Sequence, residues 1–154
     1  MAEQSINQIS FWKNTLHKIN GREIQCISGS SRIVYTDASE MGNGGYCVQT
    51  GNSASHGIWE ENERKQSSTW RELVAVERVL CLLLPFLEGQ NVKWFTDNTS
   101  VVSIVRKGSI NRNLQEIALK ILKFVLKINI RLEIEWIPRD LNDQADYPSR
   151  IVDF

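Results

Sequence analysis

The chain contains few of the residues that build zinc sites or disulfide frameworks. Its 154 residues include only three cysteines and two histidines, and the cysteines form no Cys-x-x-Cys pair. Because a chain of this length can bury its own core, and because the number of cysteines is odd, the sequence predicts reduced, mostly buried thiols in a reducing compartment. The cysteines are Cys26, Cys47 and Cys81.

Long apolar segments are also lacking. The longest apolar run, residues 79–84, ends at Pro85 and is far shorter than the roughly 20 residues that a membrane-spanning helix needs. The first ten residues contain neither the basic start nor the apolar stretch of a secretory signal peptide. We therefore expect no membrane association, no secretion, and an intracellular location that is cytoplasmic or nuclear.

The chain has no excess of charge of either sign. Eighteen acidic residues balance eighteen basic ones, and 42% of the residues are hydrophobic. A free-standing nucleic-acid-binding domain usually carries a basic excess, so tight autonomous binding to nucleic acid is not expected. Neutrality is compatible with a domain whose substrate is held mainly by its neighbours in a larger protein. Length and composition are those of a single globular domain.

Hydrophobic periodicity divides the chain into a leading segment and one α/β domain. Residues 1–30 are predicted to hold a helix over residues 5–20 and a connector, and residues 31–154 form the domain. Gly42-Asn43-Gly44-Gly45 is a predicted turn in an antiparallel meander. The order β-β-β-α-β-α-α-β predicts a five-stranded mixed sheet flanked by helices, with right-handed helical crossovers to the last two strands. Strands are predicted at residues 32–36, 46–49, 55–59, 91–96 and 131–137, and helices at residues 67–84, 99–106 and 114–127.

Acidic residues stand at the ends of several predicted elements. Asp37 and Asp97 each follow a strand as part of a Thr-Asp pair, so parallel neighbouring strands would bring both carboxylates to one edge of the sheet. Glu72 falls in the first turn of the long predicted helix, and Asp146 comes ten residues after Trp136. A single Asp of this kind more often caps a helix or closes a turn. Four acids from four separate segments instead indicate one cluster.

A carboxylate cluster implies a bound cation, because like charges repel one another unless a cation neutralises them or some of them take up protons. Oxygen ligands without a His/Cys cluster favour Mg²⁺ or Mn²⁺ over zinc. Two such ions about 3.5–4 Å apart support phosphodiester hydrolysis, in which one activates the attacking water and the other stabilises the leaving 3′ oxygen. The acids therefore predict a two-metal phosphodiesterase.

Four motifs carry these acids, and their order and spacing are informative together. They are Thr36-Asp37-Ala38-Ser39 with Gly42-Asn43-Gly44-Gly45, then Arg71-Glu72-Leu73, then Thr96-Asp97-Asn98, and finally Asn142-Asp143-Gln144-Ala145-Asp146. Together they resemble the ribonuclease H family over nearly the whole chain. The sequence looks especially like the domain that follows the polymerase in DIRS-like (tyrosine-recombinase) retrotransposons. Matching features there are Ile137-Pro138 and Ser149-Arg150 around the last motif, and Phe11-Trp12 with Asn20-Gly21 in the connector before the domain.

The resemblance implies endonucleolytic hydrolysis of the RNA strand of RNA–DNA hybrids during reverse transcription. It implies two Mg²⁺ ions, with Mn²⁺ able to substitute, held by Asp37, Glu72, Asp97 and Asp146, of which Asp37 would be shared by both ions. The implied partners are the hybrid and the polymerase domain of the same polyprotein, and the isolated domain is expected to be a monomer. The family tells RNA from DNA through 2′-OH contacts in the minor groove. Implied substrate contacts are Ser39, Asn43, Ser68, Thr69, Asn98 and Thr99.

The loop before the last acid departs from the pattern of many relatives. They carry a mobile histidine there that assists turnover, whereas this loop is Arg139-Asp140-Leu141 and both histidines lie elsewhere. The basic helix-loop that some relatives use to grip the hybrid is also missing between Lys107 and Leu114. Turnover is therefore expected to be slower or to use another group.

Two other functions and two structural questions stay open from the sequence. The domain could be a non-catalytic module that positions template–primer for an attached polymerase, although such modules typically lose one or more acids. It could also be another metal nuclease or strand-transfer enzyme of the same superfamily, although these commonly show a different final acid. The basic residues form either a phosphate track or a solvated face, and the tryptophans are expected mainly in the core. The residues concerned are Arg106, Lys107, Arg112, Lys120, Lys123 and Lys127, and Trp59, Trp70, Trp94 and Trp136.

Overall fold

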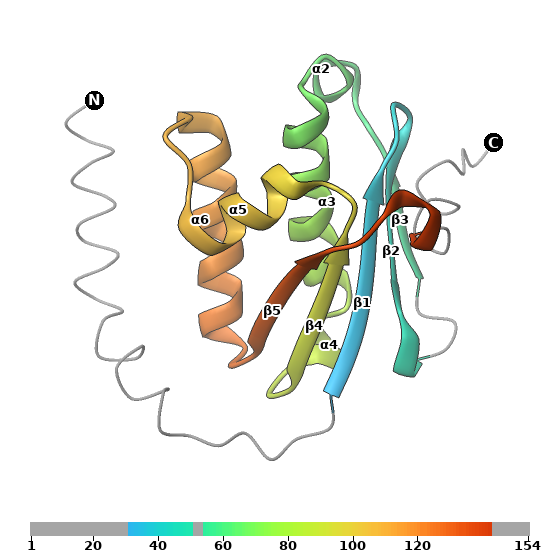
Figure 1. Ribbon diagram of the computed structural model, residues 1–154, viewed down its shortest axis with the longest axis vertical. Helices are drawn as coiled ribbons and strands as arrows, with labels where there is room; N and C mark the ends of the chain where they lie inside the picture. The colour runs from blue at the N-terminus through green and yellow to red at the C-terminus, as the bar shows by residue number, and fades with distance from the viewer. Residues whose placement is uncertain (1–30, 51–53, 143–154) are drawn as a thin grey trace.

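The computed structural model describes residues 31–50 and 54–142 (Figure 1). The predicted helix over residues 5–20, the connector that follows it, and Asp146 lie outside the described residues, so these predictions stay open. Within the described ranges, no helix combines the length and the apolar character that crossing a membrane would require.

The described residues build one five-stranded sheet with helices packed against it (Figure 1). The elements in chain order are β1 (Ser31–Ala38), β2 (Gly42–Cys47), the 3₁₀ helix η1 (Val48–Thr50), β3 (Ala54–Ile58), α2 (Glu61–Arg64), α3 (Ser68–Leu82), α4 (Leu84–Leu87), β4 (Asn91–Thr96), α5 (Thr99–Lys107), α6 (Arg112–Lys127), β5 (Arg131–Trp136) and the 3₁₀ helix η2 (Arg139–Leu141). The sheet has the order β3-β2-β1-β4-β5. β1, β2 and β3 pair antiparallel, and β1, β4 and β5 pair in parallel. The predicted five-stranded mixed sheet is confirmed.

The core lies between the sheet and the helices α3, α5 and α6. β4 shows why: Val92, Trp94 and Thr96 are buried, whereas the residues between them are only half-buried. Trp94 is buried completely, and its indole Nε1 donates a hydrogen bond of 2.9 Å to Thr36 Oγ1. This bond gives the buried indole N–H an acceptor and so offsets the cost of removing both groups from water.

The parallel pairing of β1 with β4 brings the carboxyl ends of these two strands to one edge of the sheet. Tyr35 lies opposite Phe95 in the register, so Asp37 and Asp97 both come two residues beyond a paired position. The expectation that the two strands are parallel neighbours is confirmed. In open α/β sheets, ligand sites tend to lie beyond this edge.

The stretch Gly42–Gly45 lies inside β2, so its prediction as a turn was wrong. The chain reverses earlier, where Ser39 N donates to the Gly42 carbonyl oxygen at 2.9 Å. Gly45 sits so close beneath α3 that a Cβ there would lie 2.5 Å from both methyl carbons of Val79. Glycine at position 45 therefore serves the close packing of a helix on a strand rather than a turn. The predicted strand over residues 46–49 is correspondingly replaced by the end of β2 and by η1.

Further boundaries differ from the prediction, and those nearest the acidic residues are the most informative. Asp37 lies within β1 rather than after it, because Asp37 and Ala38 pair with β2. The long helix ends at Leu82 and gives way to the short α4, which carries Pro85 in its first turn, and a short α2 precedes it. Because α3 starts at residue 68, Glu72 is its fifth residue and lies beyond the first turn.

The tryptophans follow the core prediction with one exception. Trp59 and Trp94 are buried and Trp70 is half-buried, but Trp136 is 49% exposed. Its Nε1 donates to the Asp97 carbonyl oxygen at 3.1 Å, so the ring stays at the edge of the sheet. Trp136 thus belongs to the surroundings of the acidic residues rather than to the core.

Cys26 lies outside the described residues, and the other two cysteines agree only in part with the prediction of buried thiols. Cys47 is fully buried, whereas Cys81 on α3 is exposed, so the prediction was wrong for Cys81. Burial of part of the side chain and the neighbouring Glu77 carboxylate raise the pKa of the Cys81 thiol. Cys81 is therefore poorly suited to act as a reactive thiolate.

Candidate metal centre

Three carboxylates from three separate elements meet at the edge of the sheet. Asp37 comes from β1, Glu72 from α3, and Asp97 from the residue after β4, and each offers an oxygen atom within 4.8 Å of the others. Asp37 and Glu72 are buried, and Asp97 is half-buried. The structure thus brings together three of the four acids singled out in the sequence, and the fourth, Asp146, lies outside the described residues.

Glu72 is the carboxylate whose charge is most strongly disfavoured. Desolvation by burial, followed by the charges of Asp37 and Asp97, raises its pKa to about 9. Its Oε1 accepts a hydrogen bond of 3.2 Å from Ala38 N, which lowers the pKa by a smaller amount. Its Oε2 is buried and has no hydrogen-bond partner among the described residues. A buried acceptor of this kind costs free energy unless a proton or a cation satisfies it.

Backbone hydrogen bonds hold Asp97 in place at the end of β4. The Trp136 indole binds the Asp97 carbonyl oxygen, and Ile137 N donates to the Thr96 carbonyl oxygen at 3.0 Å. The next residue, Asn98, caps α5, because its Oδ1 accepts from Val101 N at 3.1 Å. The carboxylate of Asp97 also lies 3.9 Å from Arg139 Nε, measured to Oδ2. Asp97 is therefore fixed by the ends of both β5 and α5.

The turn between β1 and β2 is fixed through Ser39. Its Oγ accepts from Met41 N and Gly42 N, each at 3.1 Å. Its carbonyl oxygen accepts from Trp59 Nε1 at 3.0 Å and from Arg71 Nη1 at 3.3 Å. Arg71 precedes Glu72 on α3, so this contact ties the helix that carries Glu72 to the strand that carries Asp37.

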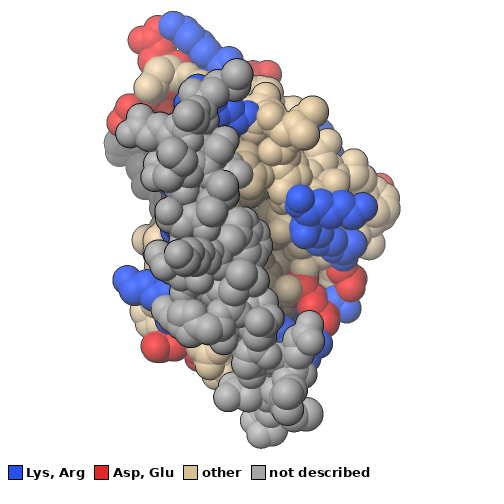
Figure 2. All heavy atoms as spheres, turned by 90° about the vertical axis from the view of Figure 1, so that its left-hand side faces the viewer, with Lys and Arg blue, Asp and Glu red and all other residues tan. Residues whose placement is uncertain are grey.

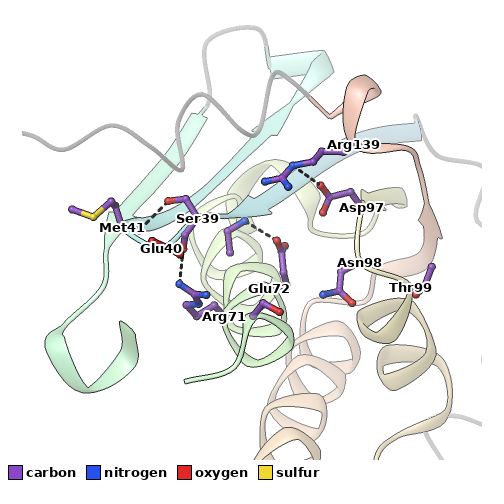
Figure 3. Close-up of a pocket in the computed structure, with 11 residues that line it drawn as sticks. Ser39, Glu40, Met41, Arg71, Glu72, Asp97, Asn98, Thr99 and Arg139 are labelled. Atoms are coloured by element: carbon purple, nitrogen blue, oxygen red, sulfur yellow. Dashed lines mark hydrogen bonds and ion pairs between the residues drawn. The ribbon is translucent and has the colours of Figure 1, made fainter. Parts of the chain in front are cut away.

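A cavity of about 880 Å³ opens beside the carboxylates (Figure 3). Figure 3 shows Glu72 and Asp97 in the middle of its wall, with Arg71 and Arg139 on opposite sides. The residues that line it are Ala38, Ser39, Glu40, Met41, Ser68, Arg71, Glu72, Asp97, Asn98, Thr99 and Arg139.

Four of the six substrate contacts implied by the sequence line this cavity: Ser39, Ser68, Asn98 and Thr99. Thr69 is half-buried on α3 and does not line it. Asn43 is 1% exposed, and its Nδ2 donates to the Gly57 carbonyl oxygen at 3.4 Å, so it joins β2 to β3 instead of facing the cavity. Sequence reasoning missed Arg139 as a member of the site. Its only signal was its place in the short loop before Asn142.

The donor set fits a hard divalent cation. The cluster offers only carboxylate oxygens, which Mg²⁺ and Mn²⁺ prefer, and the described residues place no histidine or cysteine in it. The unpartnered Glu72 Oε2 supplies an oxygen that no protein donor uses. A bound cation would also relieve the repulsion that raises the Glu72 pKa.

The choice between a phosphate track and a solvated basic face is not decided by the visible surface. On the part of the face that Figure 2 leaves uncovered, Lys and Arg side chains lie in separate groups, several of them next to acidic side chains. Arg106, one of the six candidates, donates from Nη2 to the Ile134 carbonyl oxygen at 2.5 Å and so helps to close the edge of the sheet. Both alternatives stay open.

Most of the chain matches one protein family. Residues 29–124 match the model of the RNase H-like domain found in reverse transcriptase. The chain belongs to this family. The match ends within α6, so β5, η2 and everything after them lie beyond the matched part of this RNase H-like domain.

Solved structures show the same fold for the RNase H-like domain. LC11-RNase H1, isolated from compost by a metagenomic approach and solved in complex with an RNA/DNA hybrid, has a TM-score of 0.63 and 23% identity, covering 76% of this chain and 92% of that one. RNase H1 from the archaeon Halobacterium salinarum has a TM-score of 0.63 and 15% identity, covering 77% and 94%. The protease–reverse transcriptase of prototype foamy virus has a TM-score of 0.52 and 14% identity, covering 89% of this chain and 19% of the viral one. A search of curated proteins finds no matching sequence.

Proposed function

We propose that this domain is an active ribonuclease H, which cuts the RNA strand of RNA–DNA hybrids endonucleolytically during reverse transcription. The observation that carries the proposal is the convergence of Asp37, Glu72 and Asp97, with ligand oxygens within 4.8 Å of one another beside an open cavity. Membership of the RNase H-like family of reverse transcriptases gives this cluster its chemical context. Asp146 completes the proposed ligand set.

The residues of the chain supply the ligands and the geometry. Two Mg²⁺ ions, or Mn²⁺ in their place, would activate the attacking water and stabilise the leaving 3′ oxygen when bound. Asp37, on the rigid central strand, is suited to be shared between both ion positions. Glu72 and Asp97 approach it from a helix and from a neighbouring strand, so three backbone elements set the spacing of the ligands. Ser39, Asn98 and Thr99 line the cavity beside them and can contact the substrate backbone or ribose.

The proposed substrate and partners follow from the similar proteins. LC11-RNase H1 was solved with an RNA/DNA hybrid, and the foamy virus relative is a protease–reverse transcriptase. We infer that this domain, residues 31–154 of the present sequence, acts on the same kind of hybrid. We also infer that it belongs to a polyprotein with its polymerase domain upstream. The motifs around Asn142 favour a DIRS-like element. We further propose that the protein is intracellular and that the isolated domain is a monomer.

Cleavage of a labelled RNA–DNA hybrid by the purified chain tests the proposal. We expect cutting with Mg²⁺ and with Mn²⁺, none after addition of EDTA, and none of single- or double-stranded RNA. Asp97→Asn should abolish cleavage and leave the fold intact, because it removes a metal ligand and not a core group. Glu133→Gln, on the exposed side of β5, is the matched control and should cut normally.

The outcomes separate the proposed nuclease from its alternatives. Cutting by Asp97→Asn at the wild-type rate would contradict the metal assignment. If the chain cuts neither with Mg²⁺ nor with Mn²⁺, the assay is repeated with the upstream polymerase domain joined to it. Inactivity in that longer protein would identify a non-catalytic module that positions template–primer.

A further inference from the structure

Arg139 stands at the rim of the carboxylate cavity in a position that neither the family match nor the motifs assign. Its guanidinium lies beside the Asp97 carboxylate (Figure 3), with 3.9 Å between Nε and Asp97 Oδ2. The Arg139 side chain is 70% exposed, whereas that of Asp97 is only 12% exposed. The arginine therefore approaches a largely buried carboxylate from the solvent side.

The backbone beneath Arg139 is anchored firmly, although its side chain is exposed. Asn142 is 1% exposed, and its Nδ2 donates to the Thr36 carbonyl oxygen at 2.9 Å. The backbone N of Asn142 donates to the Arg139 carbonyl oxygen at 2.9 Å. Because Thr36 directly precedes Asp37, the two bonds fix η2 to the strand that carries the central acid. The position of Arg139 is thus set by a buried anchor.

The ion pair itself is weak enough to be exchanged. A pair at 3.9 Å with a mostly exposed arginine gains little, because water screens it and the long side chain loses freedom when it is held. A divalent cation bound to Asp97 would interact with this carboxylate more strongly and would repel the guanidinium. Arg71 differs, because its Nη1 already binds the Ser39 carbonyl oxygen and holds the β1–β2 turn.

We propose that Arg139 forms a phosphate subsite at the rim of the cavity, which a phosphodiester of a nucleic-acid strand occupies once a divalent cation has taken Asp97. The planar guanidinium suits this ligand, because its N–H groups match two phosphate oxygens. Asp97 holds Arg139 in the absence of metal, and the released arginine then contacts the phosphate of a strand lying across the opening. The identity of the strand rests on the proposed function, whereas the exchange of Arg139 between carboxylate and phosphate does not.

The exchange is tested by comparing the full chain with its Arg139→Gln variant in two measurements, Mn²⁺ affinity and hybrid affinity. The proposal expects the first to rise and the second to fall, whereas a purely structural role would not change them in opposite directions. Titration calorimetry with Mn²⁺ alone should show tighter binding in the variant, by about three-fold or more, because a competing cation has been removed from Asp97. Binding of an RNA–DNA hybrid in Ca²⁺, measured over a series of salt concentrations, should be weaker, and its log–log salt slope should fall by nearly one unit, as expected for one lost phosphate contact. Arg131→Gln, at the exposed start of β5, is the matched control and should change neither readout.

Each outcome decides the proposal. Tighter Mn²⁺ binding together with a reduced salt slope supports it, and Arg139→Lys should then recover part of the hybrid affinity as a point charge. Weaker Mn²⁺ binding in Arg139→Gln, an unchanged salt slope, or no measurable hybrid binding by the wild-type chain would overturn it. If both readouts behave as expected but the wild-type chain cuts no hybrid, the subsite stands and the proposed hydrolysis fails.

Discussion

Two hollows in the surface of the described residues differ in whether their acidic side chains are paired and exposed to water. The cavity beside Asp37, Glu72 and Asp97 measures about 880 Å³, and a groove of about 540 Å³ runs between α5, α6 and β5. The groove has a floor of apolar side chains such as Ile121, and its charged residues stand at the rim. One of these charged residues, Glu135, pairs with Lys93 Nζ on the neighbouring strand β4 at 3.4 Å.

The contrast shows that unsatisfied charge, rather than the size of a hollow, marks the candidate site. Glu135 keeps both its partner and its access to water, so folding costs it little. Glu72 loses its water, gains two acidic neighbours and keeps one oxygen without a partner among the described residues, and its pKa rises to about 9. Groups with such perturbed pKa values cluster at functional sites, because a fold retains this cost only where chemistry or binding uses it.

The largest effect that would sharpen the contrast is on stability as a function of pH. In metal-free buffer, unfolded Glu72 ionises near its ordinary pKa of 4.5, whereas the folded form holds its proton up to about 9. The folded state therefore binds more protons between these values, and stability falls as pH rises through this window, by at most about 1.4 kcal/mol per pH unit. Glu72→Gln should flatten the decline and melt several degrees higher than wild type at pH 8.

Melting curves from pH 5 to pH 9 in EDTA check this expectation. Glu135→Gln, which removes the groove carboxylate that pairs with Lys93, should keep the wild-type slope. Parallel curves for wild type and Glu72→Gln would show that Glu72 is ionised in the folded protein, and the contrast between the hollows would then disappear.

A smaller effect is expected from Mg²⁺. An ion that binds only the folded state stabilises it by about 1.4 kcal/mol at ten times its dissociation constant, which corresponds to a rise in Tm of about 3–5 °C for a chain of this size. The rise should be greater at pH 8 than at pH 6, because protons compete for Glu72 at the lower value. Asp37→Asn should abolish it. Calorimetry in millimolar Mg²⁺, against NaCl of equal ionic strength, measures it, and an equal rise in Asp37→Asn would place the ion elsewhere.

The smallest effect is expected at the groove. Lys93→Gln leaves Glu135 half-exposed to water, so unfolding free energy should fall by less than about 1 kcal/mol. The Mg²⁺-induced rise in Tm should be unchanged. Urea denaturation with and without Mg²⁺ tests both points. A loss above about 2 kcal/mol, or an altered response to Mg²⁺, would mean that the two hollows are energetically coupled.

The sequence was most informative where chemistry and local pattern agreed. The runs that end in Thr36-Asp37 and Thr96-Asp97 are β-branched and aromatic, and the helical period between them requires a crossover, so parallel strands with both acids at one edge could be predicted. Gly42–Gly45 misled because the same residues serve a turn or a strand beneath a helix. Only the position of Val79 in space distinguishes the two cases, and no local pattern encodes it.

The candidate site shows the same division. The sequence predicted the clustering of Asp37, Glu72 and Asp97 from their places near the ends of strands and the start of a helix. This was possible because backbone topology sets the positions of such residues. Asn43 and Arg139 could not be placed, because their surroundings depend on side-chain direction. Asn43 points to the Gly57 carbonyl oxygen instead of the cavity, and Arg139 owes its place to the buried hydrogen bond of Asn142 with Thr36.

The absence of a Cβ atom at Gly45 lets Val79, and with it α3, pack directly against β2. Val79 lies two helical turns along α3 from Glu72, and Gly45 lies beside Thr36 in the sheet, so the thickness of this one contact sets how far the helix stands from the strand of Asp37. Any side chain at position 45 would push α3 away from the sheet. The distance between Glu72 on α3 and Asp37 on β1 would then increase. The distance between the proposed metal ligands is thus governed by side-chain volume at a buried position that does not line the cavity.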